Sequence, residues 1–278
     1  MSKTPAILGV DIGGTKVELC YFTRSFRRLA CTTIPTLEVV KHRTLTSTAL
    51  VQTVRPYLKS GVAGIGLSIK GLVHNNRIRA SSLASGTLRR DIVHELHKKL
   101  RLRVTVLNDV HAMSLAEQRF GAGRTAESFV LVNVGTGFGL GYMRQGTYLV
   151  GTNGYAGEVS HLGGVLSGKK LTALYHQNTG LSYTAEEIFL NLKHDKQARA
   201  CVAVLVSDLA HMFCLISAFY DPKLIVVTGG LTKSAGLFLP QAVARYHQLL
   251  PKTVLPAKVS LSWLPHAACL GAAIAATP

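Results

Sequence analysis

Acidic residues are scarce in this chain, which has 278 residues and carries 14 Asp and Glu against 31 Lys and Arg. The resulting net charge of +17 would suit a nucleic acid, a membrane surface or a phosphorylated ligand. No zinc finger, recognition helix or aromatic RNA-binding motif accompanies this charge, so we expect no specific nucleic-acid partner.

Long apolar runs are also missing, although 47% of the residues are hydrophobic. No stretch reaches the roughly 20 consecutive apolar residues that a membrane-spanning helix needs, so we expect no membrane partner. Residues 1–8 are too short to hold the charged, apolar and cleavage regions of a secretory signal, which predicts a cytoplasmic location.

The cysteines contain no CxxC pair of the kind that holds zinc or performs redox chemistry. They are odd in number and widely spaced along the chain. Because a free cysteine packs as a small hydrophobic residue, we predict that all of them are buried thiols. They are Cys20, Cys31, Cys201, Cys214 and Cys269.

Strand and helix patterns alternate along the chain, which is typical of an α/β fold with mixed sheets covered by helices. Two units of strand, glycine turn and strand, at 6–22 and 128–151, lie about 120 residues apart. We therefore expect two similar lobes, 1–113 and 114–278, each offering one turn to a shared central cleft. Further strands are predicted at 62–73, 104–110 and 224–230, and helices at 46–58, 90–100, 184–192, 197–218 and 269–276.

The first turn has the composition of a phosphate-binding loop. Glycine lets the backbone approach a ligand closely, and successive N–H groups with a hydroxyl can face phosphate oxygens. The carboxylate that precedes the glycines could hold a water of a nucleotide-bound Mg²⁺ ion. An ordinary Gly-Gly hairpin turn is the alternative. The residues concerned are Asp11, Gly13, Gly14, Thr15 and Lys16.

The same chemistry recurs twice downstream, which favours nucleotide binding over an ordinary turn. One repeat follows the apolar run LVNV, and the other follows LIVVT, where bare backbone leaves room for a flat base. These predicted nucleotide-binding residues are Gly135, Thr136, Gly137, Gly229 and Gly230. Neither GxxxxGK[ST] nor a strand, GxGxxG and helix arrangement is present, which argues against P-loop enzymes and dinucleotide oxidoreductases.

Five motifs occur in one order along the chain: DIGGTK at 11–16, ND at 108–109, GTGFGLG at 135–141, AGEVSH at 156–161 and DPKLIVVTGG at 221–230. Together they closely resemble the ROK family of bacterial repressors, open reading frames and sugar kinases. The resemblance implies an actin-like ATPase (ribonuclease H-like) fold, with two lobes closing over ATP and a sugar. It also implies a homodimer.

The resemblance assigns Asp109, beside Asn108, as the general base that takes the proton from a sugar hydroxyl. Helix capping is the alternative role for an Asp at this place. By the same resemblance Glu158 and His161 bind the sugar, and the backbone of Gly71 faces it.

The chain departs from the family between residues 161 and 180, where the CxCGxxGCxE zinc motif of most members has no counterpart. A four-ligand zinc site cannot be assembled from His161 alone, so we expect no zinc. Tyr175 stands at the position of a sugar-binding Glu, and its phenol can hydrogen-bond a hydroxyl but cannot accept as a carboxylate does.

Two functions remain from the sequence. The first is ATP-dependent phosphorylation of a hexose or an N-acetylated amino sugar, with Mg²⁺ as the metal ion. The second is a sugar-sensing regulatory protein that is non-catalytic or weakly active on the same fold. Because the first turn begins at residue 11, we expect no N-terminal helix-turn-helix of the kind that family repressors carry.

Overall fold

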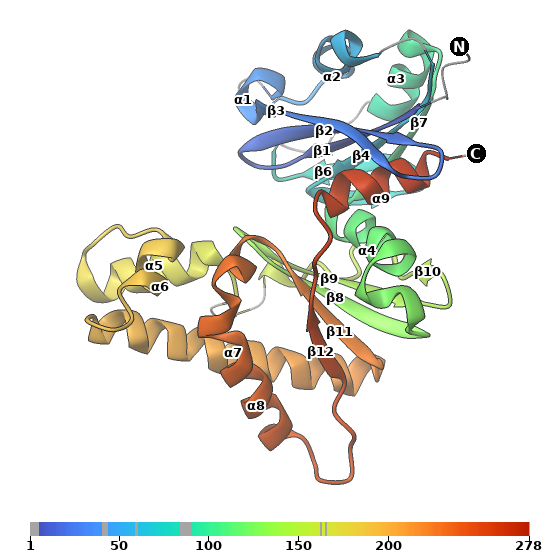
Figure 1. The fold of residues 1–278 in the computed structure, drawn as a ribbon. Helices are drawn as coiled ribbons and strands as arrows, with labels where there is room; N and C mark the ends of the chain where they lie inside the picture. The colour runs from blue at the N-terminus through green and yellow to red at the C-terminus, as the bar shows by residue number, and fades with distance from the viewer. Residues whose placement is uncertain are drawn as a thin grey trace. The chain divides into compact units, whose positions relative to one another are not determined.

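The computed structural model describes residues 6–40, 44–58, 61–83, 91–161, 163–164 and 166–277, except for the side chain of His161. The chain divides into two units, each built on a five-stranded mixed sheet (Figure 1). The first unit takes in segments 1–121, 150–156 and 264–278, and the second takes in 122–149 and 157–263. The predicted split at 113/114 differs from this division, because the end of the chain returns to the first unit.

The sheet of the first unit has the strand order β3-β2-β1-β4-β7. Strand β1 pairs antiparallel with β2 and parallel with β4, and β4 pairs parallel with β7. The strands are β1 (Ala6–Ile12), β2 (Lys16–Thr23), β3 (Arg28–Pro35), β4 (Val62–Ile69) and β7 (Arg103–Asn108), with a separate hairpin of β5 (Gly71–His74) and β6 (Arg77–Ser81).

Helices cover both faces of this sheet because its parallel central strands, β1 and β4, are apolar and buried on both sides, as parallel strands in α/β folds are. One face packs against α1 (Thr36–Val39), α2 (Ser47–Val54) and α3 (Ile92–Leu100). The other packs against α4 (Asp109–Phe120) and α9 (Ala267–Ala275), which lie side by side in Figure 1.

The sheet of the second unit has the matching order β10-β9-β8-β11-β12. Its first strand again pairs antiparallel with the next strand and parallel with a later one. Its strands are β8 (Ser128–Val134), β9 (Phe138–Arg144), β10 (Thr147–Tyr148), β11 (Leu224–Thr228) and β12 (Lys258–Leu261). The predicted α/β class, with mixed sheets in two similar units, is confirmed.

Among its described residues, the second unit contains the α-helices α5 (Gly168–Thr179), α6 (Ala185–Leu190), α7 (Lys196–Tyr220) and α8 (Leu239–Leu249). By length and composition α7 is apolar enough to cross a membrane. It is also the central core helix of this unit, since Leu205, Leu209 and Phe213 are fully buried beside the sheet. This packing accounts for the buried part of the helix, which is 44% of its most apolar window.

The prediction of five buried thiols is wrong for Cys20 and Cys31, and Cys214 is only partly buried. Cys20 on β2 and Cys31 on β3 lie directly opposite each other and form a disulfide. Strand register decides this pairing, because opposed residues of an antiparallel pair are close enough for their side chains to bond. Cys201, Cys214 and Cys269 are free, and the first and last of them are buried.

Reducing the disulfide is expected to lower the free energy of unfolding. The bond joins residues that are 11 apart in sequence. Closing a loop of this length restricts the unfolded chain, and the lost chain entropy stabilises the folded state by about 3 kcal/mol. Urea unfolding with and without dithiothreitol, in the presence of a chelator, measures this difference. Cys214→Ser should show the same difference, and an unchanged midpoint on reduction would contradict the prediction.

Candidate active site

Several predicted site residues gather at one edge of the first unit's sheet. Strands β1, β4 and β7 run parallel, so their carboxyl ends share this edge. Asp11 is opposite Ser68, and Ser68 is opposite Leu107, two residues before Asp109. Two strand spacings, about 10 Å, therefore separate the rows that carry the two carboxylates.

Asp11 is held by the β4 neighbour that the register gives it. The hydroxyl of Ser68 donates a hydrogen bond of 2.7 Å to Oδ1 of Asp11. Burial raises the pKa of Asp11 from 3.8 to about 6, an effect that the Ser68 bond opposes. The negative charge of this partly buried carboxylate is not fully compensated, and a hard cation such as Mg²⁺ would compensate it.

Asp11→Asn is expected to stabilise the protein above pH 6. A carboxyl whose pKa is raised by folding binds a proton more tightly in the folded state than in the unfolded state. The contribution of Asp11 to the free energy of unfolding therefore falls as the pH rises from 3.8 to about 6. Above that range the ionised Asp11 costs about 3 kcal/mol, a cost that asparagine avoids. Denaturant unfolding at pH 4 and pH 7 without Mg²⁺ tests this.

The exposed Asp221→Asn is the matched control for net charge, because it removes an equal charge outside the sheet edge. It should give no comparable gain at pH 7. If Asp11→Asn changes the free energy of unfolding by the same amount at pH 4 and at pH 7, the cost assigned to the ionised Asp11 is contradicted.

The turn between β1 and β2 is fixed by backbone bonds and by a residue of α1. The N–H of Gly13 donates to the carbonyl of Lys16, which closes the hairpin. Thr36 then bridges the turn, since its N–H donates to Thr15 O and its hydroxyl donates to Gly13 O at 2.8 Å. Gly14 and Thr15 remain exposed at the tip, so their N–H groups can face a ligand.

Asn108 ties the start of α4 to the start of β5. Its Oδ1 accepts from the N–H groups of Val110 and His111, and its Nδ2 donates to the carbonyl of Gly71 at 3.0 Å. The cap of α4 is therefore Asn108, and the alternative of capping by Asp109 is not what the structure has. Gly71 must be small here, because a Cβ would lie 2.3 Å from the carbonyl oxygen of Ala80.

Asp109 is the first residue of α4, and its Oδ1 accepts from the N–H of Val110 at 3.0 Å. The positive end of the helix dipole at this position favours the ionised carboxylate. An ionised, partly exposed carboxylate is the form that a general base requires. The sheet edge thus brings together Asp11, the 13–16 turn, Gly71, Asn108 and Asp109.

The two predicted glycine turns of the second unit also meet, because β8 and β11 are parallel neighbours. Their ends carry Gly135 and Gly230, and a Cβ on Gly135 would lie 3.6 Å from the N of Gly230. Gly229 has a φ of +101°, and a Cβ there would lie 2.4 Å from Oδ1 of Asn133. Only glycine fits this position, since both the conformation and the space exclude a side chain.

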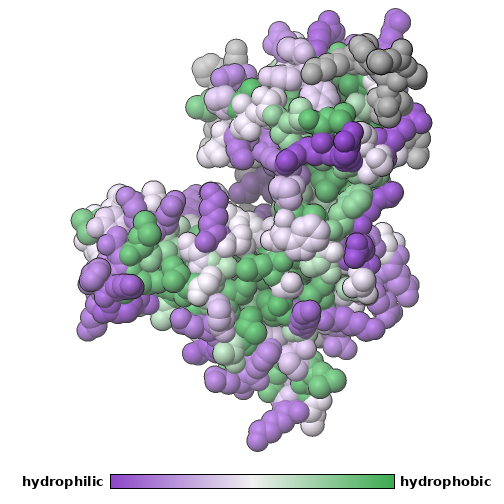
Figure 2. Space-filling view, in the orientation of Figure 1, coloured by the Kyte–Doolittle hydropathy of each residue, from purple (hydrophilic) through white to green (hydrophobic). Residues whose placement is uncertain are grey.

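A cavity of about 800 Å³ opens beside these turns. Gly135, Thr136 and Gly230 line it from the predicted set. Phe189 of α6 and Leu231 of η4 (Gly230–Leu237) add apolar surface to its wall, whereas Thr172, Thr184, Glu186 and Ser234 add polar groups. Figure 2 shows hydrophobic and hydrophilic surface interspersed over the second unit. Lys169 and Lys233 supply positive charge at the cavity, which suits a flat, partly apolar ligand with an anionic tail.

Glu158 and His161 lie in the segment that follows β10. Gly157 fixes this loop, because its carbonyl accepts from the N–H of Leu140 and a Cβ would lie 1.9 Å from Leu140 O. Glu158 precedes η3 (Val159–His161) and is partly exposed. The side chain of His161 lies outside the described residues, so its predicted role stays a prediction.

Tyr175 has a different environment from the one its sequence position predicts. Its ring is buried, stacks on Tyr183 and belongs to the core of the second unit. Its hydroxyl donates to Oδ2 of Asp195 at 2.5 Å, and this bond raises the pKa of Tyr175 to about 12. The hydroxyl of Tyr175 thus already donates its hydrogen bond to Asp195, the residue that caps α7. We therefore leave Tyr175 out of the proposed sugar site.

The sequence did not point to several residues that shape these sites. Thr36 and Ser68 act through contacts with segments far away in the chain, which no local motif announces. Gly168 donates its N–H to Gly135 O and lines the cavity. A detectable signal existed there, since SGKK places a helix-capping serine, Ser167, directly before α5, which begins with Gly168 and two lysines.

Comparison with known proteins gives one consistent result. The ROK family matches residues 7–165 and 162–277 of the chain. N-acetyl-D-glucosamine kinase of Haemophilus influenzae is 27% identical over 269 residues, covering 84% of this chain and 88% of that protein.

Two solved structures share the fold over nearly the whole chain. The ROK hexokinase of Thermus thermophilus has a TM-score of 0.81 at 24% identity, with 98% of this chain and 97% of that one covered. A ROK glucokinase of Streptomyces griseus, crystallised with glucose and AMPPNP, has a TM-score of 0.80 at 21% identity, with coverages of 98% and 99%. The expected actin-like ATPase fold is therefore confirmed.

Proposed function

The chain belongs to the ROK family, and on that premise we propose that it is a sugar kinase that transfers the γ-phosphoryl group of ATP to a hexose or an N-acetylated amino sugar. The observation that carries this proposal is the arrangement at the start of α4. Asn108 supplies the helix cap and holds the carbonyl of Gly71, so the neighbouring carboxylate of Asp109 is not needed for capping.

In the proposed reaction Asp109 accepts the proton of the attacking sugar hydroxyl. General-base catalysis of this kind typically contributes about a hundredfold to ten-thousandfold in rate. Glu158 and His161 are proposed to hold the sugar, together with Asn108 and the backbone at Gly71. These residues orient the hydroxyl, and correct orientation supplies much of the catalysis in phosphoryl transfer.

Backbone N–H groups of the two glycine turns are proposed to bind the phosphate oxygens of ATP. The first turn is 13–16, and the second is 135–137, beside the cavity that would take the adenosine. Gly230 leaves bare backbone at the wall of that cavity, and Gly229 precedes it in the chain. Fixed N–H dipoles stabilise the negative charge on the phosphoryl oxygens in the transition state, which lowers the barrier to phosphoryl transfer.

Mg²⁺ is proposed to be held through Asp11, whose partly buried carboxylate and raised pKa fit a cation at this place. When bound, the ion would neutralise negative charge on the phosphate oxygens. The predicted cytoplasmic location and homodimer remain predictions of the sequence.

A sugar panel tests the proposed function. Purified protein with Mg-ATP is incubated with glucose, mannose, fructose, allose, N-acetylglucosamine or N-acetylmannosamine, and ADP release is followed. We expect at least one sugar to stimulate ADP release about tenfold or more over the rate without sugar. Sugar binding by calorimetry with no stimulated ADP release would instead favour the sugar-sensing alternative.

A further inference from the structure

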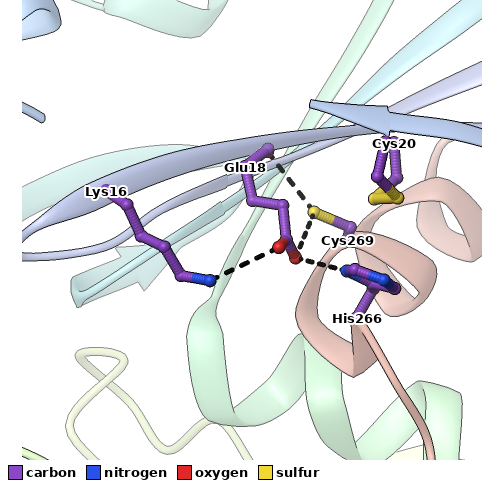
Figure 3. The surroundings of a disulfide bond; sticks show 6 residues. Lys16, Glu18, Cys20, His266 and Cys269 are labelled. Atoms are coloured by element: carbon purple, nitrogen blue, oxygen red, sulfur yellow. Dashed lines mark hydrogen bonds and ion pairs between the residues drawn. A yellow bond between two sulfur atoms is a disulfide. The ribbon is translucent and has the colours of Figure 1, made fainter. Parts of the chain in front are cut away.

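A cluster of sulfur, imidazole and carboxylate groups lies in the first unit and has no part in the proposed kinase chemistry. Ligand atoms of Cys20, Cys31 and His266 all lie within 4.8 Å of one another. Those of Glu18, Cys20 and Cys269 meet the same limit. Figure 3 shows the disulfide, the imidazole and the Glu18 carboxylate grouped on one side of β2.

The fold assembles this cluster from three separate elements. Glu18 and Cys20 are two residues apart on β2 and therefore share one face of the strand. Cys31 is brought in by the register of β3, and that face packs against α9. His266 stands immediately before α9 in the left-handed conformation, with a φ of +54°, which directs the chain into the helix.

The carboxylate of Glu18 fixes the state of the imidazole. Two contacts hold the carboxylate in place, one from Nζ of Lys16 to Oε1 at 3.5 Å and one from Nδ1 of His266 to Oε2 at 2.9 Å. An ionised carboxylate can only accept, so Nδ1 of His266 donates in the 2.9 Å contact with Oε2. In a neutral imidazole this leaves the lone pair on Nε2, and carboxylate-oriented histidines of this type are common metal ligands.

We propose that reduction of the Cys20–Cys31 disulfide creates a binding site for one thiophilic divalent cation such as Zn²⁺, formed by the two thiolates and Nε2 of His266. Glu18 acts as the positioning residue that orients the imidazole. The expectation of no zinc came from residues 161–180 of the second unit, and this site lies elsewhere.

The redox step is balanced by a dithiol reductant. The dithiol gives two electrons and two protons to Cys20 and Cys31, their S–S bond breaks, and the dithiol becomes a disulfide. The cation then displaces both thiol protons, and two thiolates with a neutral imidazole balance its double charge. Zn–S bonds of 2.3 Å in a tetrahedral site hold two sulfurs about 3.8 Å apart, so disulfide and metal exclude each other.

The fourth position is assigned to water rather than to Cys269. Cys269 is not part of the group of Cys20, Cys31 and His266, whose ligand atoms all lie within 4.8 Å of one another. Its thiol instead donates to two oxygens of Glu18, the backbone oxygen at 3.4 Å and Oε2 at 3.7 Å. Three protein ligands and a water complete a tetrahedral zinc site.

Metal titration of the full-length protein tests the proposal directly. The protein is reduced with dithiothreitol, freed of reductant and metal under nitrogen, and titrated with Co²⁺ beside the oxidised protein. We expect one Co²⁺ per chain in the reduced protein only, with thiolate-to-cobalt charge-transfer absorption and tetrahedral d–d bands that Zn²⁺ abolishes. Equal binding by the oxidised protein, or a spectrum without charge transfer, would overturn the proposal.

Three variants assign the ligands. Cys31→Ser and His266→Asn should each weaken Zn²⁺ binding by at least about a hundredfold, and Glu18→Gln by about tenfold to a hundredfold. Asparagine tolerates the left-handed conformation and keeps both thiols, so His266→Asn does not depend on the folding of a cysteine variant.

Cys214→Ser is the matched control, since this free cysteine lies in the second unit, away from the cluster. It should bind Zn²⁺ as the parent does. If Cys31→Ser or His266→Asn binds as tightly as the parent, or if Cys214→Ser loses binding, the site is not where we assign it. None of these measurements depends on kinase activity.

Discussion

Asp109→Asn is expected to lower kcat for sugar phosphorylation by at least about a hundredfold, because asparagine cannot accept the proton of the attacking hydroxyl. Asparagine has nearly the same shape, so α4 and its cap on Asn108 should survive. Loss of the charge at the helix start should cost only about 0.3 to 1 kcal/mol of stability. Steady-state kinetics at saturating sugar and Mg-ATP measure the effect.

Asp91→Asn is the matched control, because Asp91 also stands at a helix start of the first unit, as the cap of α3. Asparagine caps helices about as well as aspartate, so kcat should stay near that of the parent. The general-base role is contradicted if Asp109→Asn keeps kcat within about tenfold of the parent. An equal loss in both variants would point to a folding defect instead.

Gly271→Ala is expected to destabilise the first unit by more than about 3 kcal/mol, because the new Cβ would overlap the backbone of a neighbouring helix. It would lie 1.6 Å from the carbonyl oxygen of Ala112 on α4. Neither helix can yield easily, since a Cβ on Gly66 of β4 would likewise lie 1.8 Å from Ala272 O on the other side of α9. Denaturant unfolding gives the loss in free energy.

Gly236→Ala is the control for this substitution, because a Cβ there meets nothing within 4 Å. We expect its unfolding free energy to stay within about 1 kcal/mol of the parent. If Gly271→Ala is as stable as Gly236→Ala, the close packing of α4, α9 and β4 does not have the energetic role assigned to it.

Local patterns predicted the elements of the candidate site well. Alternating apolar residues around DIGGTK predicted the hairpin, and the glycines after LVNV and LIVVT predicted two further turns. In the structure these are β1-β2, β8-β9 and the end of β11. Such features depend on neighbours in sequence, because strand periodicity and turn conformation are set within a few residues.

Side-chain partners were predicted less well, because they depend on register and packing between distant segments. Tyr175 was expected to face a sugar, yet its hydroxyl reaches Asp195 on the next long helix. Asn108 rather than Asp109 caps α4, a distinction of one residue that the ND motif leaves open. The domain boundary was also placed differently, because nothing local in CLGAAIAA says that this helix returns to β1.

The sequence by itself determined the α/β class, the two glycine-turn hairpins and the membership of the ROK family, since each is written in periodicity or in contiguous motifs. Only the tertiary structure decided which cysteines pair, where α9 packs and which groups surround His266. The physical reason is that these contacts join residues far apart in the chain. Their distances are fixed by strand register and by backbone approach at glycines, which no short stretch of sequence encodes.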